Sequence, residues 1–517
     1  MNRGEAPRGG RSPSGRPIIW HGLPLAAPVL GLLLLWAPWP FGSVTPWAET
    51  ILTAGILAAF LLALASRRVG AAFRPVATPA LALVALALLG LAQSLPWPAA
   101  VAEAVSPAHA RLGREAAVAL EPSGLAPAPT SVPLSLAPAE SRRSALTFAV
   151  LAAALAAAAA AGRHRGGRRL LGVALLAATL GQVLYGVPRW LAHTETLWGA
   201  PVYFAGRLRG TFVNPNHFAL YLEIALAAAF AWGWWAWSRA ARFGIPPERR
   251  VILAGSPALV WLTLFLALAF TGSRAGLVAG VLGTVAQGAL VAFRHGLRRQ
   301  GVRWALSGAL VAAAGLAVVA WAGYEKGLAR LAATSPYELA WGDRTQVCIH
   351  TLELWRSFPG LGTGLGTFLD AFPLVQPASV DDLWRHAHND PLELLAVTGV
   401  TGALLAAVGL FALVRRLLRV LRSGQRREDR AAALAALGAL TALGLHGLAD
   451  FGITMPANAL TLAVLVGAAA AAPVEAPAGP AAAEPPGPSP VPARRVRRRR
   501  PGRARAGEGR EGEPPRR

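Results

Sequence analysis

The chain has 517 residues, of which 54% are hydrophobic and only 15% charged, and its mean hydropathy is +0.44. A soluble protein of this length would carry more charge, so this composition excludes an ordinary soluble multidomain protein. The formal net charge of +24 is spread over short loops and both ends of the chain. This distribution favours membrane topology and argues against nucleic-acid binding. Cys348 is the single cysteine, which excludes an intramolecular disulfide and a cysteine-based metal site.

Apolar blocks of roughly twenty residues recur along the chain, the length that spans a hydrocarbon core ~30 Å thick. Lipid offers the backbone no hydrogen bonds, and the blocks do not alternate apolar and polar residues. They therefore predict an all-α integral membrane protein with about twelve spans, and exclude a barrel. In chain order the spans are expected near 22–40, 46–66, 76–95, 144–161, 169–191, 213–236, 251–271, 274–293, 302–323, 391–413, 431–450 and 456–472.

The connections between these blocks alternate in charge, which predicts the orientation of the chain. Arginine-rich connections are expected on the cytoplasmic side, together with the basic N-terminus. These connections are 67–74, 163–169, 239–250, 294–303 and 415–430. The other set is expected outside: 96–143, 192–212, 271–273, 324–390 and 450–455. A wrong number of spans would break this alternation.

The same pattern divides the chain into regions. Residues 1–21 form a basic cytoplasmic N-terminus that resembles a signal sequence, but no small-residue cleavage site follows, so the first span is expected to stay. Residues 22–323 carry helices one to nine, and 324–390 form a large outer loop before helices ten to twelve in 391–472. The Pro/Ala-rich tail 473–517 is expected to be disordered, with arginines that set topology or bind anionic lipid.

A first group of candidate site residues lies where an outer loop enters the span near 213. The group is Arg207, Arg209, Asn214, Asn216 and His217. Polar groups at a membrane boundary are costly unless they have partners. Helix capping accounts for one asparagine, but not for two asparagines, a histidine and two arginines. The segment therefore favours substrate binding over capping alone.

Two further arginines stand on the predicted outer side. Arg274 follows the tight Thr271–Ser273 turn, where its alternative role is a snorkelling anchor, and Arg344 lies near the start of an amphipathic helix expected from Asp343 through Trp355. Outer-edge arginines run against the positive-inside bias, which favours a functional role. The glycine-rich segment 359–366 lacks the Lys-Ser/Thr of a P-loop and a β-α-β setting, so it predicts a close-approach turn and not a nucleotide site.

The densest ionisable cluster ends the large outer loop and contains His386, His388, Asn389 and Asp390. A His-x-His pair can bind a metal, but no further ligand set is present, so no metal is expected. A general base fits better, because a neutral imidazole titrates near neutral pH. His446 and Asp450 are four residues apart and are expected to share a helix face, as either a catalytic or a structural pair.

These segments all fall on one predicted membrane face, which fits a site for a lipid-linked substrate. Outward arginines can bind a diphosphate through charge-assisted, often bidentate, hydrogen bonds. They would also stabilise the charge that grows as a diphosphate leaves.

Five motifs carry a resemblance to a known family. In chain order they are Arg-x-Arg-Gly-Thr-Phe-x-Asn-Pro-Asn-His-Phe, Ser-Arg-Ala-Gly, Pro-Gly-Leu-Gly-Thr-Gly-Leu-Gly-Thr-Phe, His-Asn-Asp-x-Leu-Glu and His-Gly-Leu-Ala-Asp-Phe-x-Ile-x-x-Pro-Ala-Asn. Together they resemble the O-antigen ligase / Wzy-type polymerase superfamily over most of 200–460. The resemblance implies a GT-C-like glycosyltransferase of the bacterial inner membrane, with a long periplasmic loop between helices nine and ten.

The resemblance further implies transfer of a glycan from undecaprenyl diphosphate to lipid A-core, to a growing polysaccharide or to a protein, without a metal or other cofactor. The family's essential residues correspond to Arg274, Arg344 and His388, and also to Arg209. The expected mechanism is inverting: the arginines hold the diphosphate, His388 takes the acceptor proton, and Asn389 and Asp390 orient His388 or the acceptor. Ligase, polymerase and protein O-oligosaccharyltransferase remain open. A flippase would instead place charges deep within the spans, where the sequence has almost none.

Overall fold

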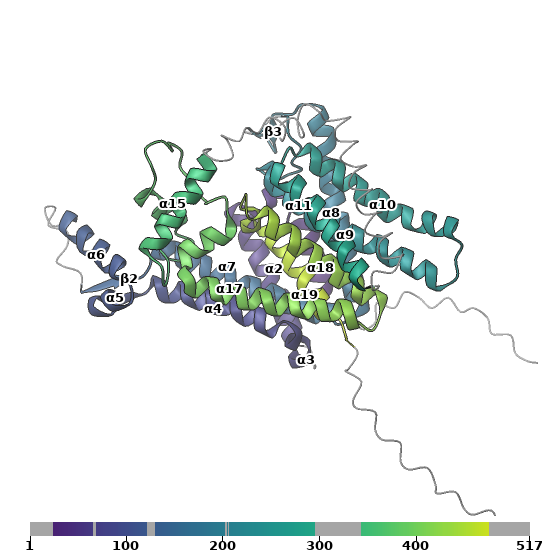
Figure 1. Cartoon of the computed structure of the whole chain (residues 1–517), viewed down its shortest axis with the longest axis horizontal. Coiled ribbons are helices and arrows are strands. Elements are labelled where there is room, and N and C mark those ends of the chain that lie inside the picture. The colour runs from purple at the N-terminus through teal and green to yellow at the C-terminus, as the bar shows by residue number, and fades with distance from the viewer. Residues whose placement is uncertain are drawn as a thin grey trace, which may run out of the picture. The chain divides into compact units, whose positions relative to one another are not determined.

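The computed structural model describes residues 24–65, 69–120, 130–201, 204, 206–294 and 343–474 (Figure 1). The expected span 302–323, the basic N-terminus 1–21 and nearly all of the tail 473–517 lie outside the described residues. The described part is mostly helical, and its only strands form two short antiparallel pairs. This agrees with the predicted all-α class.

Eight helices of the described part are long and apolar enough to cross a membrane. They are α2 (Pro46–Leu64), α4 (Ala77–Ser94, extended from Gly70 by the short helix α3, Val69–Phe73, and a 3-10 turn), α7 (Pro138–Gly162), α8 (Arg165–Leu191), α9 (Pro215–Arg242), α10 (Pro247–Phe270), α11 (Arg274–Arg294) and α17 (Asp390–Ser423). Two apolar helices are shorter, α1 (Ala26–Trp36) and α19 (Pro456–Ala470), and α18 (Arg427–His446) coincides with the expected span 431–450. The number of twelve spans remains a prediction.

The region 96–143, expected as an outer loop, is partly folded. β1 (Pro96–Pro98) pairs antiparallel with β2 (Ser131–Pro133), and α5 (Ala99–Val105) and α6 (Pro107–Leu120) lie between them in the sequence. A second pair, β3 (Thr196–Leu197) and β4 (Ala200–Pro201), forms a tight hairpin after α8. Two more helices follow the segment that is not described: α15 (Asp343–Ser357) and the short α16 (Phe368–Ala371).

The helices pack around two central members. α9 contacts α18, α10 and α11, while α7 contacts α4, α19 and α2. The Ala/Gly-rich sequence of α7 has a direct steric reason, because a Cβ added to Gly162 would lie only 2.3 Å from the Cα of Ala468 in α19. Small residues let helix backbones approach closely, which is how helices associate in lipid.

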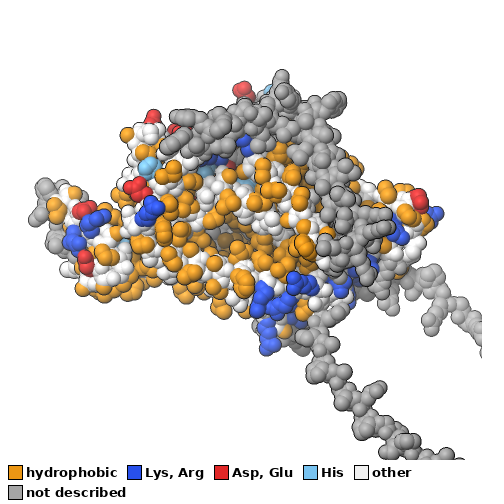
Figure 2. Space-filling view, in the orientation of Figure 1, with side chains coloured by type: hydrophobic (Ala, Val, Ile, Leu, Met, Phe, Trp, Pro, Cys, Tyr) orange, Lys and Arg blue, Asp and Glu red, His pale blue; other side chains and the backbone are white. Residues whose placement is uncertain are grey.

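Large apolar side chains are exposed on the outer faces of these helices. Leu184, Ile252 and Phe411 are each 69% or more exposed. Figure 2 shows hydrophobic side chains spread across the middle of the visible face, with a cluster of Lys and Arg below them. Such a broad apolar surface is what lipid contact requires and what water penalises.

α17 is interrupted at Gly399, where φ is 62° and ψ is −169°. The glycine-rich segment 359–366 lies against this break and supplies the backbone partners that the helix loses. Thr363 N donates to Ala396 O at 3.0 Å, and Val400 N donates to Pro359 O at 2.9 Å. A break within a span is tolerated only where protein satisfies the freed backbone groups, and here this segment does so.

Two features fix the segment in place. Gly362 has φ of 73°, and a Cβ there would lie 2.3 Å from the backbone carbon of Val397, so the predicted close-approach turn is confirmed. Gln93 of α4 donates from Nε2 to Leu361 O at 2.7 Å and accepts from Leu365 N at 3.0 Å. The segment therefore joins α4 to α17.

The arginines that begin α8 are paired with the first turn of α18. Arg165 and Arg169 both donate to Glu428, at 2.7 Å and 2.5 Å. Arg168 is bonded to Asp429, and both side chains are nearly inaccessible, at 6% and 0% exposure. These arginines therefore bind two helices together in addition to any role in orientation.

Candidate functional site

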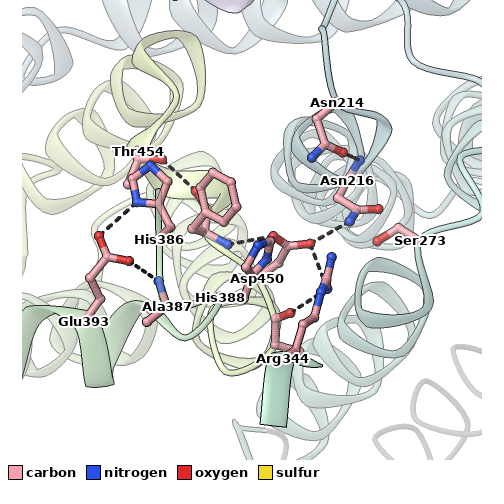
Figure 3. Close-up of polar contacts among 12 residues, drawn as sticks. Asn214, Asn216, Ser273, Arg344, His386, Ala387, His388, Glu393, Asp450 and Thr454 are labelled. Atoms are coloured by element: carbon pink, nitrogen blue, oxygen red, sulfur yellow. Dashed lines mark hydrogen bonds and ion pairs between the residues drawn. The ribbon is translucent and has the colours of Figure 1, made fainter. Parts of the chain in front are cut away.

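The predicted polar segments meet where α9, α11, α15 and α17 begin and where α18 has just ended (Figure 3). The starts of these four helices bring side chains from distant parts of the sequence to one place. Asn216, Arg344, His388 and Asp450 come together there. Asp450 is the residue on which the others converge.

The carboxylate of Asp450 is buried and accepts four hydrogen bonds. Oδ1 accepts from His388 Nδ1 and from the backbone N of Phe451, both at 3.0 Å. Oδ2 accepts from Asn216 Nδ2 at 2.6 Å and from Arg344 Nη1 at 3.5 Å. Burial alone would raise the pKa of Asp450, but the hydrogen bond from His388 and the charge of Arg344 outweigh burial and hold that pKa below its usual range.

An ionised Asp450 fixes the tautomer of His388. A carboxylate can only accept, so Nδ1 of His388 carries the hydrogen that points to Asp450, and the lone pair of the neutral ring lies on Nε2. The side chain of His388 is 16% exposed. Its backbone φ of 53° is in the left-handed region, which is costly for a residue other than glycine and is concentrated at functional sites.

Phe451 forms an apolar wall for three imidazoles. Its ring stacks on His386 at 4.1 Å between centroids, and His388 and His217 meet it edge-on at 4.7 Å and 4.8 Å. His217 is buried at 6% exposure and belongs to the first turn of α9. The wall holds the three rings at fixed angles to one another.

Arg207 joins the site to the turn before α11. Its Nη2 donates to Asn216 Oδ1 and its Nε donates to Thr271 O, both at 2.6 Å. Asn216 therefore bridges Arg207 and Asp450. Ser273 of the same turn lies beside Asn216 in Figure 3, and Arg274 follows it with an exposed side chain.

Arg344 is the second residue of α15 and stands at the open edge of the site. Its side chain is 49% exposed, and Nη1 also donates to Ala449 O at 3.2 Å. One side of the guanidinium is anchored by Asp450 and the backbone, and the rest faces solvent. An exposed but anchored arginine is suited to meeting an anionic ligand.

His386 is held by Glu393, so the His-x-His pair does not converge on one point. His386 Nδ1 lies 2.9 Å from Glu393 Oε1, and Ala387 N donates to Glu393 Oε2 at 2.8 Å. Across the described ranges, no group of three or more His, Cys, Asp or Glu side chains is placed to hold a metal ion. The sequence did not single out Glu393, although it lies one turn into α17 and close to the histidines.

Three predicted site residues have structural partners. Asn214 caps α9 by accepting from Asn216 N at 2.9 Å, and Asn389 caps α17 by accepting from Leu392 N at 3.0 Å. Asn389 also donates to Leu448 O at 3.2 Å, and Asp390 N donates to Gly447 O at 2.7 Å. Neither Asn389 nor Asp390 has a hydrogen bond to His388 in the described structure, where Asp450 provides that contact.

The expectation that His446 and Asp450 share one helix face was wrong. α18 ends at His446, and Asp450 lies in the turn that follows. Nδ1 of His446 lies 2.7 Å from Oε1 of Glu223 in α9, and both side chains are fully buried. Glu223 lies in an otherwise apolar run, and its role could not be predicted, because its partner His446 belongs to another helix.

Arg209 lies away from Asp450. It is 8% exposed and lines a separate pocket after α8 with Arg189 and Arg207. No contact between Arg209 and His388, Arg344 or Asp450 is seen in the described residues. Arg207 lines this pocket and also bonds to Asn216, the partner of Asp450.

Residues 257–407 match the family model described as O-antigen ligase. The match includes Arg274, Arg344 and His388 and ends within α17. No curated protein matches the chain.

Proposed function

We propose that this chain, whose residues 257–407 belong to the O-antigen ligase / Wzy-type superfamily, transfers an oligo- or polysaccharide from undecaprenyl diphosphate to an acceptor hydroxyl. The observation that carries the proposal is the contact between His388 and Asp450 beside Arg344. A histidine oriented by a buried carboxylate is an arrangement suited to removing a proton from a hydroxyl. An arginine beside it is suited to an anionic leaving group.

In the proposed reaction, Nε2 of His388 takes the proton from the acceptor hydroxyl. The hydroxyl oxygen forms a bond to the anomeric carbon from the face opposite the diphosphate, and the bond from that carbon to the diphosphate oxygen breaks. The configuration inverts, and undecaprenyl diphosphate leaves with the electron pair. Asp450 orients the ring of His388 and stabilises the imidazolium that forms, whereas Asn389 and Asp390 were expected to orient His388 or the acceptor.

Arg344 and Arg274, with Arg209 and Arg207, are proposed to hold the donor diphosphate. Arg344 offers an exposed guanidinium at the edge of the site, and Arg274 begins α11 next to Ser273. Asn216, His217 and His386 shape the surroundings of Asp450 and Phe451, whereas Asn214 acts first as a helix cap. The reaction needs neither a metal nor another cofactor.

We also propose that the chain is a multi-pass protein of the bacterial inner membrane with this site on the periplasmic face. Residues 324–390 would then form the periplasmic loop between helices nine and ten, followed by helices ten to twelve in 391–472. Arg344 and His388 both belong to that segment and meet at one site through Asp450. The arginine-rich connections would lie on the cytoplasmic side.

The direct test is transfer in vitro from a lipid-linked oligosaccharide by the purified full-length protein. His388→Ala should lower turnover by two or more orders of magnitude, the range expected for loss of a general base. His350→Ala is the matched control, because His350 lies on α15 and bonds only to Glu353 among the described residues. Near-normal turnover of a folded His388→Ala protein would refute the role of His388. Loss of activity in chelator that a divalent ion restores would refute the metal-free mechanism.

The glycan profile of a strain that lacks this protein would distinguish a ligase from a polymerase. Accumulated lipid-linked polymer with a bare acceptor would identify a ligase, and loss of polymer length would identify a polymerase. Loss of glycan from protein alone would identify a protein O-oligosaccharyltransferase. The ligase is the primary proposal, and its acceptor is a glycan, lipid A-core or a protein.

A further inference from the structure

Two polar pairs join α9 to the end of α18 and the turn that follows it. Asn216 and Glu223 are seven residues apart in α9, so they lie on the same face of the helix, two turns apart. Asn216 Nδ2 donates to Asp450 Oδ2 at 2.6 Å. Glu223 Oε1 lies 2.7 Å from His446 Nδ1. One face of α9 therefore holds both His446 and Asp450, which are four residues apart in the sequence.

The backbone of His446 connects the two pairs. Its carbonyl oxygen accepts from Ala449 N at 2.9 Å and from Asp450 N at 3.0 Å, where α18 ends. A shift of His446 along α9 would therefore carry the carboxylate of Asp450 with it. That carboxylate is the group that orients His388, at 3.0 Å from its Nδ1.

The contact between Glu223 and His446 lies where ionisable side chains are costly. Both side chains are fully buried, and Glu223 belongs to a helix apolar enough to cross a membrane. Groups in such surroundings lose their hydration and need a strong partner, and they mark functional positions. An apolar contact would hold α9 and α18 together without fixing how far one slides along the other. A short polar contact has a direction and fixes a single register.

α11 leaves room for this pair. A Cβ added to Gly276 would lie 3.0 Å from Glu223 Oε1 and 2.8 Å from the Cβ of Ala219. Gly276 ends the Ser-Arg-Ala-Gly motif, and Ser273 of the same motif lies beside Asn216 (Figure 3). The first turn of α11 therefore packs against α9 beside both polar pairs.

We propose that Glu223 and His446 are positioning residues, which set the register of α18 on α9 so that Asp450 meets His388. Neither Glu223 nor His446 has a hydrogen bond to His388 within the described residues, so the pair acts through Asp450. Its effect on turnover rests on the proposed transferase function. The alignment of Asp450 with His388 is a property of the chain itself and does not.

The first test is the steady-state kinetics of Glu223→Ala in the purified full-length protein. The kcat should fall about a hundredfold, the scale on which a small misplacement of a catalytic group acts, while the KM for the lipid-linked donor stays unchanged. Glu223→Gln should recover most of the lost kcat, because an amide oxygen can still accept a hydrogen from His446. An unchanged kcat in Glu223→Ala, or a raised KM at normal kcat, would overturn the proposal.

Gln287→Ala is the matched control. Gln287 is a buried polar side chain of α11 whose Nε2 donates to Ala227 O and Leu434 O, both at 3.0 Å, so it also joins α9 to α18. Gln287→Ala should lower the thermal unfolding temperature and leave kcat close to that of the wild type. Equal losses of kcat in Gln287→Ala and Glu223→Ala would overturn the proposal, because any weakening of the helix packing would then impair turnover.

A double-mutant cycle tests whether Glu223 acts through Asp450. The double variant Glu223→Ala/Asp450→Asn should have the same kcat as Asp450→Asn alone, because the contact that Glu223 aligns is already lost. Losses that multiply would show that the two residues act independently, which would overturn the positioning role.

The alignment can also be measured without turnover, by the rate at which diethyl pyrocarbonate modifies His388. Asp450 holds the hydrogen of the ring on Nδ1 and leaves the lone pair of Nε2 to react. Mass spectrometry of the peptide that contains His388 should show this reaction slowed in Glu223→Ala to the same extent as in Asp450→Asn. A reaction slowed in Asp450→Asn but not in Glu223→Ala would overturn the proposal. A slowed reaction in both variants of a protein without transferase activity would support the positioning role and refute only the proposed function.

Discussion

His388 Nδ1 and Asp450 Oδ1 lie 3.0 Å apart although 62 residues separate them in the sequence. Asp450→Asn should lower turnover by about two to four orders of magnitude, because an amide can hold the wrong tautomer of His388 and cannot stabilise an imidazolium. Turnover of the purified variant measures this. Asp370→Asn is the control, since Asp370 is an exposed carboxylate of α16. Full activity of Asp450→Asn would remove Asp450 from the mechanism.

The buried Arg168–Asp429 pair should be important for stability. Asp429→Asn is expected to destabilise the protein by about 3–5 kcal/mol, because Arg168 would keep a buried charge without its partner. Thermal unfolding in detergent measures the effect. Glu49→Gln removes a half-buried partner of the exposed Arg143 and should change stability by less than about 1 kcal/mol. Similar unfolding temperatures for the two variants would contradict the prediction.

His109 should make the region 96–143 sensitive to acid. Burial lowers the pKa of His109 to about 4, and the ring packs against Phe358 at 4.8 Å. His109 of the unfolded chain therefore binds a proton near pH 6.5, whereas His109 of the folded chain binds one only at lower pH. The stability of α6 is complete above that pH and decreases as the pH falls toward 4, with about 2 kcal/mol lost at pH 5.

Proteolytic cleavage within α6 at pH 7 and pH 5 checks this expectation. The increase in cleavage on acidification should be smaller in His109→Gln, which carries no titratable ring at this position. His350→Gln should behave like the wild type. An equal increase in all three proteins would assign the acid sensitivity to another group.

The glycines between 360 and 366 should differ sharply in their tolerance of a side chain. Gly362→Ala is expected to cost at least about 2 kcal/mol, because φ is 73° and the new Cβ would overlap the backbone of Val397. Gly360→Ala is the matched control, since nothing lies within 4 Å of a Cβ added there. Thermal unfolding of the two variants should therefore separate them, and equal stability would show that the turn adapts.

The sequence predicted much of the site because the relevant residues mark helix starts. Asn214, Asn216 and His388 each stand beside a proline-initiated helix, so their placement at the ends of spans could be inferred from local pattern. The helical class followed from the length of the apolar blocks. Both inferences depend on short stretches of sequence.

The central role of Asp450 could not be predicted in this way. The spacing from His446 suggested one helix face, but the helix ends first, and the partners of Asp450 come from α9, α15 and the segment before α17. Glu223 was missed for the same reason, since its partner lies in another helix. Contacts between distant segments are set by helix packing, which a single sequence does not reveal.

The glycine-rich segment that lies against the break in α17 also constrains how this protein can vary. Its backbone is matched residue by residue to the interrupted helix, from Pro359 O with Val400 N to Gly364 N with Val397 O. An inserted or deleted residue would put every one of these pairs out of register at once and leave polar backbone groups facing an apolar interior. Homologous chains should therefore tolerate side-chain changes at open positions such as Gly360, while the length of this segment stays constant.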